Sequence, residues 1–405
     1  MFFEFVRKAL RIGTTATVLG FAAIASPPAA SAQPALVTAH EWASYTARYL
    51  DRSGRIVDVE KNGVSHSEGQ GYGLLLAVYA NDEATFRRIL RFTFNEMRGR
   101  GDGLISWLYN PRAYPPVTDT NNASDGDILI AYALVQAAMQ WNDARYLADA
   151  EPLIDAIGRH LLVRHGDKVL LKPAAFGFDR HTHRDGPVVN LSYFVYGAFP
   201  LFAQINTRYP WIEAWQSGLM LTAQSLSGRE ALAPDWVSLR GDRYLKPASG
   251  YAKKSSYDAV RIPLYMMLGG RVPTEYLVPF DHAWNVRGNG APVDYDLAAD
   301  RKIIDMNDLG YRAIAALTAC AVRGAPLPGF VARFRPTTYY ASSLHLLALA
   351  AARAHYPACV PTPREQVVAA RDAKRPDFPT PRDYALRRNA TSRDSLRFVE
   401  IGSVN

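Results

Sequence analysis

Apolar residues recur at intervals of three and four positions through most of the chain. Leu134, Ala137, Ala138 and Trp141, for example, fall on one side of a helix with 3.6 residues per turn. Strand-like runs are few and short, such as Lys168–Leu171. The pattern predicts an all-α chain with helices over His40–Leu50, Gly69–Ala80, Asp82–Met97, Asp127–Trp141, Ala144–His160, Val189–Gln204, Trp211–Ser225, Tyr257–Leu268, Asn307–Val322 and Ser342–His355.

Long connections rich in aromatic and polar residues separate some of these helices, notably Gly101–Ser124 and Ala231–Ser256. Long ordered loops in a compact domain are often functional. Alternating short and long connections between helices fit a toroid of helical hairpins. In such a toroid we expect the long loops to gather at one end, around a cleft.

The first residues have the three parts of a secretory signal peptide. A positive segment over residues 7–11 precedes an apolar run over residues 12–25, and Ala30-Ser31-Ala32 matches a small-residue cleavage signal. The apolar run is shorter than the ~20 residues of a membrane span, and Pro27-Pro28 follows it. We therefore expect removal of residues 1–32, a periplasmic or secreted mature protein, and no stable insertion into a membrane.

Charge and composition divide the remainder into a folded body and a tail. We expect one domain over residues 33–360 and a polar, Pro-containing tail over residues 361–405, which carries nine Lys/Arg and six Asp/Glu. The leader and the tail hold much of the formal charge of +8, so the body is only mildly basic. It shows no basic stripe with interleaved aromatic residues, and we expect no nucleic-acid partner. The two cysteines, Cys320 and Cys359, could pair or remain buried thiols, and both alternatives stay open.

A first candidate site is His66-Ser67-Glu68-Gly69-Gln70-Gly71-Tyr72-Gly73, at the entrance of an apolar helix. Three glycines beside one carboxylate let another backbone or a ligand approach closely. Ser65 and Glu68 also match a capping box, in which Glu68 would satisfy backbone N–H groups. Taken alone, this segment favours the capping role.

A second candidate is the acidic run from Asp119 to Asp127, which leads into another helix. Asp125 or Asp127 would serve there as an N-cap with favourable placement in the helix dipole. A calcium loop does not fit, because the run lacks the spacing of Asp/Asn, Gly and Glu that an EF-hand needs.

A third candidate is Ser256-Tyr257-Asp258-Ala259-Val260-Arg261. Asp258 and Arg261 are three positions apart and would share a helical face, which is also the arrangement of an ordinary ion pair. A carboxylate held by arginine stays ionised, and it then serves as a base rather than as an acid.

Other chemistries find little support in the sequence. It contains no G-x-S-x-G elbow, no phosphate-binding GxxxxGK loop and no H-E-x-x-H zinc helix. His181 and His183 are better explained as polar surface than as metal ligands. We therefore expect neither a metal nor a cofactor.

Together these segments resemble glycoside hydrolase family 8, particularly its bacterial cellulases. The family's acid motif corresponds to Ser67–Gly73, and its A-[ST]-D-[AG]-D signature to Ala123–Asp127. The Tyr-Asp-Ala-x-Arg segment corresponds to Tyr257–Arg261. The stretches Asp102–Trp107 and Asn190–Tyr193 also look like family elements, although Leu191 stands where the family often has proline.

The resemblance implies an (α/α)6 barrel and an inverting endo-β-1,4-glucanase. Glu68 would be the general acid, Asp258 the general base, and Asp125 would hold sugar hydroxyls. Inversion needs two carboxyl groups about 6.5–9.5 Å apart, with a water between the base and the sugar. It also needs the two pKa values pushed apart; we expect Asp125 to raise the pKa of Glu68 and Arg261 to favour the ionised form of Asp258.

A glucan cleft needs aromatic platforms flanked by hydrogen-bonding side chains, because sugar rings have apolar faces and polar rims. Trp107, Tyr193 and Trp236 are the platform candidates, with a buried core position as the alternative for each. The substrate-binding candidates closer to the chemistry are Gln70, Tyr72 and Arg261.

Two alternatives remain at this stage. One is an enzyme of the same family with another specificity, such as a lichenase, chitosanase or xylanase; the mildly basic body argues against chitosan. The other is a glucan-binding protein without turnover, which the presence of Glu68, Asp125 and Asp258 argues against. The resemblance also suggests polymer trimming in association with a bacterial cellulose synthase system.

Overall fold

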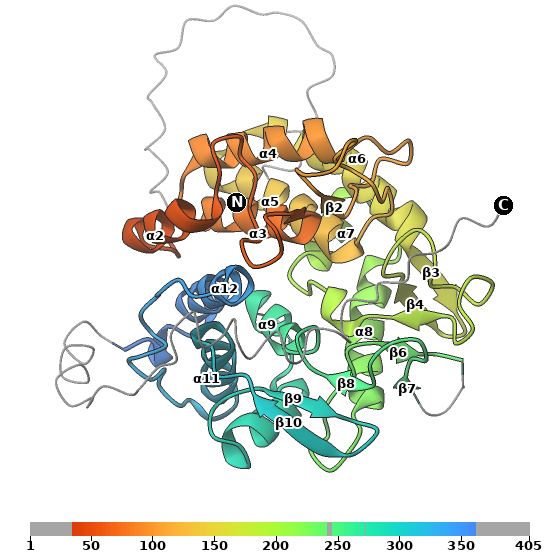
Figure 1. Ribbon diagram of the computed structural model, residues 1–405, viewed down its shortest axis with the longest axis vertical. Helices are drawn as coiled ribbons and strands as arrows, with labels where there is room; N and C mark the ends of the chain where they lie inside the picture. The colour runs from red at the N-terminus through yellow and green to blue at the C-terminus, as the bar shows by residue number, and fades with distance from the viewer. Residues whose placement is uncertain (1–34, 241–244, 271, 362–405) are drawn as a thin grey trace, which may run out of the picture.

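The computed structural model describes residues 35–240, 245–270 and 272–361. Within these ranges the chain is mainly helical and its strands are short (Figure 1). The helices are α2 (Ala39–Tyr49), α3 (Ser67–Tyr79), α4 (Glu83–Met97), α5 (Ser124–Trp141), α6 (Ala144–Leu161), α7 (Phe199–Ile205), α8 (Trp211–Ser225), α9 (Arg261–Leu268), α10 (Val278–Asp281), α11 (Leu309–Arg323) and α12 (Tyr339–His355). The strands are β1 (Ser65–His66), β2 (Leu108–Tyr109), β3 (Leu162–His165), β4 (Lys168–Leu171), β5 (Val188–Val189), β6 (Val237–Ser238), β7 (Lys246–Pro247), β8 (Lys254–Ser255), β9 (Val293–Asp296) and β10 (Arg301–Asp305).

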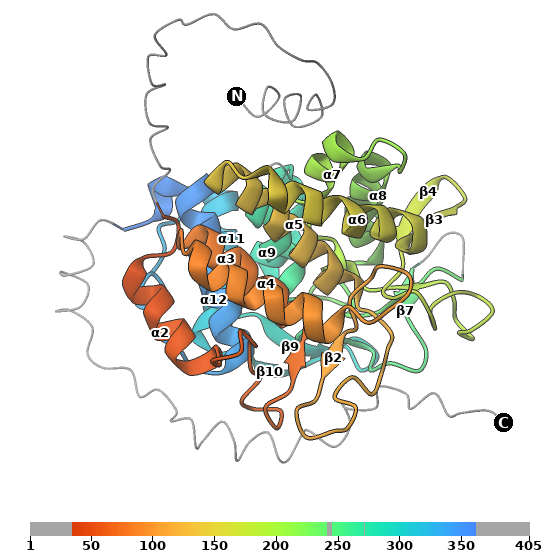
Figure 2. The ribbon, with the colours of Figure 1, turned by 90° about the horizontal axis from the view of Figure 1, so that it is seen from above.

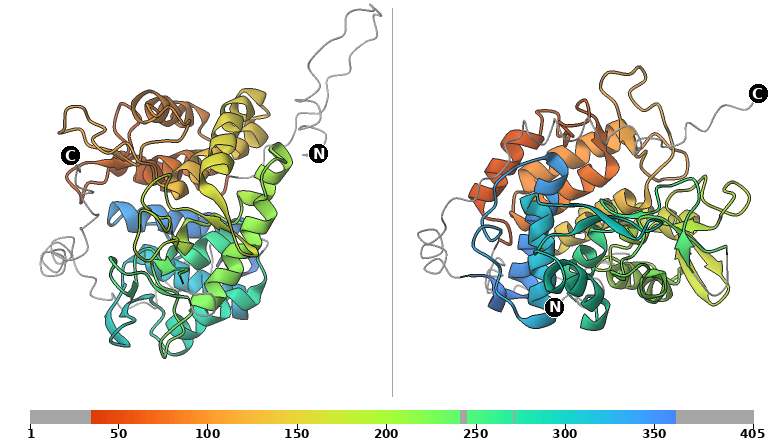
Figure 3. Two further views of the ribbon diagram at one scale, coloured as in Figure 1. Left: turned by 90° about the vertical axis from the view of Figure 1, so that its right-hand side faces the viewer. Right: turned by 60° about the horizontal axis from the view of Figure 1, so that its bottom comes forward.

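The helices α3, α5, α9 and α12 are buried on nearly all sides and form the inner wall of the barrel. α3 contacts α5, α5 contacts the 3₁₀ turn Leu191–Tyr193, and that turn contacts α9. α9 in turn contacts α12, and α12 contacts α3, so the ring closes (Figure 3). A helix that is apolar all round must be buried, which is why these sequences occupy the centre.

Amphipathic helices cover the outside of this ring. α4 packs on α3, α6 on α5 and α2 on α12, each burying one face. The hairpin connections are short: Asp82 caps α4 through the N–H of Thr85, and Asp143 caps α6 through the N–H of Arg145. This arrangement of inner and outer helices is the (α/α)6 barrel predicted from the sequence.

Glycines let α3 and α5 approach closely within the ring. A Cβ atom on Gly71 would lie 2.5 Å from Cβ of Leu129, and one on Gly126 would lie 2.8 Å from the backbone nitrogen of Glu68. The glycine-rich acid motif and the A-S-D-G-D motif are therefore two sides of one helix contact. This contact brings Glu68 and Asp125, each the second residue of its helix, to the same end of the barrel.

Short strands precede three elements of the inner ring: α3, the 3₁₀ turn Leu191–Tyr193 and α9. β1 leads directly into α3, β5 precedes the 3₁₀ turn at Leu191, and β8 precedes the turn before α9. β1 pairs with β2, β5 with β6, and β8 with β9. Figure 2 shows β2 and β9 along one side of the molecule, with β10 beside them. The pairing fixes the loops at the end of the barrel where the inner helices start.

Most predicted helices match the structure within a few residues, but the one predicted over Val189–Gln204 is wrong. Residues 188–189 form β5, the 3₁₀ turn spans Leu191–Tyr193, and only Phe199–Ile205 forms an α-helix. The Asn190 side chain accepts the N–H of Ser192 and ends the strand in a tight turn. Local side-chain capping of this kind competes with helix formation.

The start of the helix predicted over Tyr257–Leu268 is also wrong, because α9 begins at Arg261. Residues 257–260 form a turn whose N–H groups are partly held by a distant carboxylate, Asp235. The apolar periodicity continues through the turn, so the start of the helix could not be predicted from it.

The two cysteines form a disulfide bond, which resolves the alternative left open by the sequence. It joins the last turn of α11 to the 3₁₀ turn Pro357–Cys359 that follows α12. None of the helices in the described ranges is long and apolar enough to cross a membrane. The predicted leader and nearly all of the predicted tail lie outside the described residues.

Candidate active site

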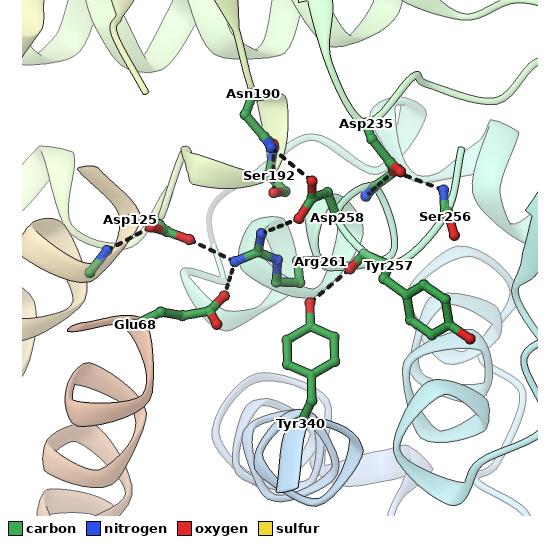
Figure 4. A network of polar contacts seen from close by, with 12 residues as sticks. Glu68, Asp125, Asn190, Ser192, Asp235, Ser256, Tyr257, Asp258, Arg261 and Tyr340 are labelled. Carbon is green, nitrogen blue, oxygen red and sulfur yellow. Dashed lines mark hydrogen bonds and ion pairs between the residues drawn. The ribbon is translucent and has the colours of Figure 1, made fainter. Parts of the chain in front are cut away.

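Arg261, the first residue of α9, joins three carboxylates that are far apart in the sequence (Figure 4). Its Nη1 pairs with Oε1 of Glu68 and, at 2.7 Å, with Oδ2 of Asp125. Its Nη2 pairs with Oδ1 of Asp258 at 2.9 Å. The sequence predicted Arg261 as a partner of Asp258; the structure makes it a partner of Glu68 and Asp125 as well.

Glu68 does not cap its helix. α3 begins at Ser67 with His66 at the N-cap, and the Ser65 hydroxyl group donates to the carbonyl oxygen of Ile56 instead. The Glu68 carboxylate binds Arg261 and accepts a hydrogen bond from the Tyr72 hydroxyl group at 3.0 Å. The capping role favoured by the local sequence is therefore wrong.

Neither aspartate of the A-S-D-G-D motif is the N-cap of α5, a position that Ala123 occupies. Asp125 faces Arg261, while Asp127 turns toward the loop on its other side. Asp127 accepts the N–H of Ile105 at 2.8 Å and the amide of Asn122 at 2.7 Å. Asp127 thus binds the long connection between α4 and α5 at two points, Ile105 and Asn122.

Asp258 is the most open of the three carboxylates. Its side chain is 31% exposed, against 17% for Glu68 and 3% for Asp125. Oδ2 accepts a hydrogen bond from the Asn190 side chain at 3.1 Å, and Oδ1 binds Arg261. Water can therefore reach Asp258 while the other two carboxylates stay largely shielded.

The pKa of Glu68 differs from that of an ordinary surface glutamate. Burial raises the pKa of Glu68 to about 7; Arg261 opposes this shift, and the negative charge of Asp125 adds to it. Burial also raises the pKa of Asp125, again against the effect of Arg261. One guanidinium does not offset the cost of burying both the Glu68 and the Asp125 charge, so this pair of carboxyl groups favours holding a proton near neutral pH.

Trp107 is the platform candidate whose position suits a sugar contact best. Its ring is partly exposed and lies parallel to His66, with 5.9 Å between ring centroids. The indole N–H donates to Asp119 at 2.7 Å, which fixes the ring at the entrance of α3. Ser67, the first residue of that helix, donates its N–H to the Trp107 carbonyl oxygen.

Trp236 and Tyr193 are more enclosed. Trp236 is 8% exposed and stacks on Phe178 and Tyr251, with centroid distances of 5.6 and 4.4 Å. This packing fits the core alternative for Trp236 better than a platform. Tyr193 lies in the site, but the guanidinium of Arg261 is over its ring, 5.5 Å from the centroid.

Gln70 lies apart from the carboxylate cluster. It is fully buried, its amide oxygen accepts the N–H of Ile56 at 2.7 Å, and its amide nitrogen donates to Thr93 at 2.9 Å. This position does not suit the predicted contact with substrate. Tyr72 is also fully buried, and it reaches the site only through its hydroxyl group on Glu68.

Three further residues, which the sequence did not single out, support the cluster. Asn190 holds Asp258, Tyr340 donates to the carbonyl oxygen of Tyr257 at 2.7 Å, and Asp235 binds the turn that carries Asp258. Asn190 stood within a family-like segment, and Asp235 within a loop expected to be functional. Neither was distinguishable there from other polar loop residues. Among the described residues, no group of three or more His, Cys, Asp or Glu is arranged to hold a metal ion.

The sequence model for glycosyl hydrolases family 8 matches residues 16–354. The chain belongs to this family. It is therefore a glycoside hydrolase, as the motifs predicted. A protein of Novacetimonas hansenii named probable endoglucanase is 34% identical over 332 residues, which cover 81% of this chain and 95% of that protein.

Solved structures of family members share the fold. The endo-β-1,4-glucanase of Acetobacter xylinum superposes with a TM-score of 0.71 at 33% identity, over 79% of this chain and 98% of the other. The family 8 endoglucanase of Klebsiella pneumoniae gives a TM-score of 0.70 at 32% identity, over 78% of this chain and 99% of the other. The family-like motifs of the carboxylate cluster thus stand in a chain that resembles these enzymes over most of its length.

Proposed function

We propose that this family 8 glycoside hydrolase is an inverting endo-β-1,4-glucanase that acts on cellulose or a related β-glucan. The observation that carries the proposal is that the carboxylates of Glu68, Asp125 and Asp258 all pair with the Arg261 guanidinium. Relatives named as endoglucanases support the choice of substrate.

Glu68 serves as the general acid that protonates the glycosidic oxygen. Its raised pKa of about 7 supports this role, because the acid must hold a proton near neutral pH. Sugar binding must also weaken the contact between Arg261 and Glu68, since that contact favours the ionised carboxylate.

Asp258 serves as the general base that activates water on the opposite face of the sugar. Its exposure and its hydrogen bonds from Arg261 and Asn190 support this role. Glu68 and Asp258 bind different nitrogens of one guanidinium, so they are held apart by its width instead of touching. Separation of this kind suits inversion, which needs room for a water between base and sugar. Asp125 holds sugar hydroxyl groups between the two.

Hydrolysis of a panel of carboxymethylcellulose, lichenan, xylan and chitosan tests the substrate. We expect release of reducing sugar from carboxymethylcellulose, and a loss on the order of 10²–10⁴-fold in Glu68→Gln. The control is Glu96→Gln, the same change on the exposed face of α4. Equal rates in wild type and Glu68→Gln would rule out Glu68 as the acid. NMR of the first product tests inversion, and a β-anomer there would exclude Asp258 as the base.

We also propose the division into a leader over residues 1–32, a catalytic domain over residues 33–360 and a tail over residues 361–405, with a periplasmic or secreted location. The disulfide between Cys320 and Cys359 supports this location, because such bonds persist in oxidising compartments. N-terminal sequencing of the periplasmic protein tests cleavage after Ala32. A role in trimming polymer beside a cellulose synthase belongs to the same proposal, and the cellulose made by a deletion strain tests it.

A further inference from the structure

Asp235 binds the turn that carries Asp258 from outside that turn (Figure 4). Its Oδ1 accepts the N–H of Ser256 at 2.8 Å and the N–H of Ala259 at 2.9 Å. Its own N–H donates to the carbonyl oxygen of Lys254 at 2.8 Å. The chain is thus fixed to Asp235 on both sides of Asp258.

These contacts give the turn before α9 a hydrogen-bond acceptor from a residue distant in the sequence. The first N–H groups of a helix need acceptors, which a nearby Ser, Thr, Asp or Asn usually provides. At α9 the N-cap is Val260, whose side chain has no acceptor. Asp235 instead serves the turn before the helix, where it accepts the N–H groups of residues 21 and 24 positions later in the sequence. The N–H of Arg261, which begins α9, bonds to the carbonyl oxygen of Asp258.

Asp235 acts on the backbone around Asp258, whereas other residues hold its carboxylate. The two Asp258 oxygens bind Arg261 and Asn190. Among the described residues, Asp235 makes no hydrogen bond to Glu68, Asp125 or Arg261. Arg261 and Asn190 therefore fix the direction of the Asp258 carboxylate. Asp235 fixes the position of the backbone that carries it.

The charge state of Asp235 determines which substitution preserves this role. Burial and the negative charge of Asp258 raise the pKa of Asp235 well above its usual range, and its two backbone N–H donors oppose the shift. Asp294 adds a further negative charge, which pairs with Lys254. A neutral side chain with one acceptor oxygen is thus suited to the site, and asparagine has that form.

We propose that Asp235 is a positioning residue for the general base: it fixes the turn so that Asp258 faces the attacking water. The inference rests on the proposed function, in which Asp258 is that base. A misplacement of ~1 Å can cost on the order of 10² in rate. The platform candidate Trp107 lies on another element, the connection between α4 and α5, so we expect the loss in kcat and not in KM.

Kinetics of Asp235→Ala, Asp235→Asn and Asp235→Glu on carboxymethylcellulose test the inference. We expect kcat of Asp235→Ala to fall on the order of 10²-fold with KM little changed. Asp235→Asn keeps the acceptor oxygen and should restore kcat to near the wild-type value. Asp235→Glu keeps the acceptor but displaces the turn by one methylene group, so its kcat should fall.

Asp296→Ala is the matched control. Asp296 likewise accepts two backbone N–H groups, from Ala298 and Ala299, in the turn after β9, and not from the turn that carries Asp258. Its loss should leave kcat unchanged. A folded Asp235→Ala enzyme with wild-type kcat overturns the inference. If Asp235→Ala does not fold, equal kcat values for the Asn and Glu variants overturn it.

The two proposals fail in different ways. A folded wild-type protein without activity on any β-glucan refutes the proposed function, and the inference with it. An active enzyme that loses activity in Asp258→Asn but keeps kcat in Asp235→Ala refutes only the inference.

Discussion

The hydroxyl group of Tyr72 donates a hydrogen bond to Oε1 of Glu68 at 3.0 Å, from the next turn of the same helix. A hydrogen bond donated to a carboxylate favours its ionised form. Tyr72 therefore works against burial, which raises the pKa of Glu68. Together with the charges of Arg261 and Asp125, burial and the Tyr72 hydrogen bond determine the pKa of Glu68, and so the pH above which the proposed acid loses its proton.

Tyr72→Phe should move the basic limb of the kcat/KM profile to higher pH. The change removes the donor and keeps the ring, so the pKa of Glu68 rises from about 7. The Tyr265 hydroxyl group, 2.8 Å from that of Tyr72, loses a buried partner, which should cost about 1 kcal/mol of stability. The measurement is kcat/KM for a soluble β-glucan as a function of pH.

The control for this change is Tyr146→Phe. Tyr146 donates to Glu83 at 2.8 Å on the outer helices, so its removal is chemically equivalent but lies outside the site. Its profile should match the wild type. A basic limb at lower pH in Tyr72→Phe would contradict the assignment of Glu68 as the titrating acid.

Asp125→Asn should move the same limb in the opposite direction. The negative charge of Asp125 raises the pKa of Glu68, so its removal lowers that pKa and activity falls at lower pH. The rate should also drop on the order of 10²-fold, because a sugar-binding group is lost. The measurement is the pH profile of kcat/KM for both variants in one buffer series. Opposite shifts of the basic limb in Asp125→Asn and Tyr72→Phe identify Glu68 as the titrating acid more firmly than either variant alone.

The sequence predicted the architecture well because the inner helices are apolar on all sides and the outer helices are amphipathic. It failed where a contact from far along the chain decides local structure. The turn before α9 is one case, since its N–H acceptor is Asp235. Glu68 is another: its own segment matches a capping box, and only its contact with Arg261 shows where the carboxylate points.

Gly126→Ala should slow the enzyme although it changes no carboxylate. A Cβ atom there would clash with the Ser67 side chain and lie 2.8 Å from the Glu68 backbone nitrogen. The start of α3 must then move away from α5, which separates Glu68 from Asp125. We expect kcat to fall on the order of 10²-fold and stability to fall by about 1–3 kcal/mol.

The control is Gly166→Ala, at a glycine whose Cβ would meet no atom within 4 Å. This variant should lose stability through its positive φ but keep kcat. Full activity in Gly126→Ala would show that the helix contact does not set the site.

Trp107→Ala and Trp236→Ala should separate a platform from a core residue. Trp107 is partly exposed, so its loss should raise KM several-fold with a small change in Tm. Trp236 is packed against Phe178 and Tyr251, so its loss should cost about 3–5 kcal/mol of stability. Thermal unfolding and steady-state kinetics on both variants check this. A raised KM and an unchanged Tm in Trp236→Ala would restore its predicted role as a platform.

The disulfide between Cys320 and Cys359 should stabilise the fold without contributing to the chemistry. It closes a segment of 39 residues that contains α12, and α12 is part of the inner ring. A loop of this length predicts a loss of about 3–4 kcal/mol in the free energy of unfolding when both cysteines become serine. Neither cysteine contacts the carboxylate cluster, so kcat at low temperature should be unchanged.

Urea unfolding with and without a thiol reductant is the measurement. The reductant should destabilise the wild type to the level of the double variant and leave the double variant unaffected. If the reductant changes neither protein, the bond is not formed in solution, and the support that it lends to an oxidising compartment is lost.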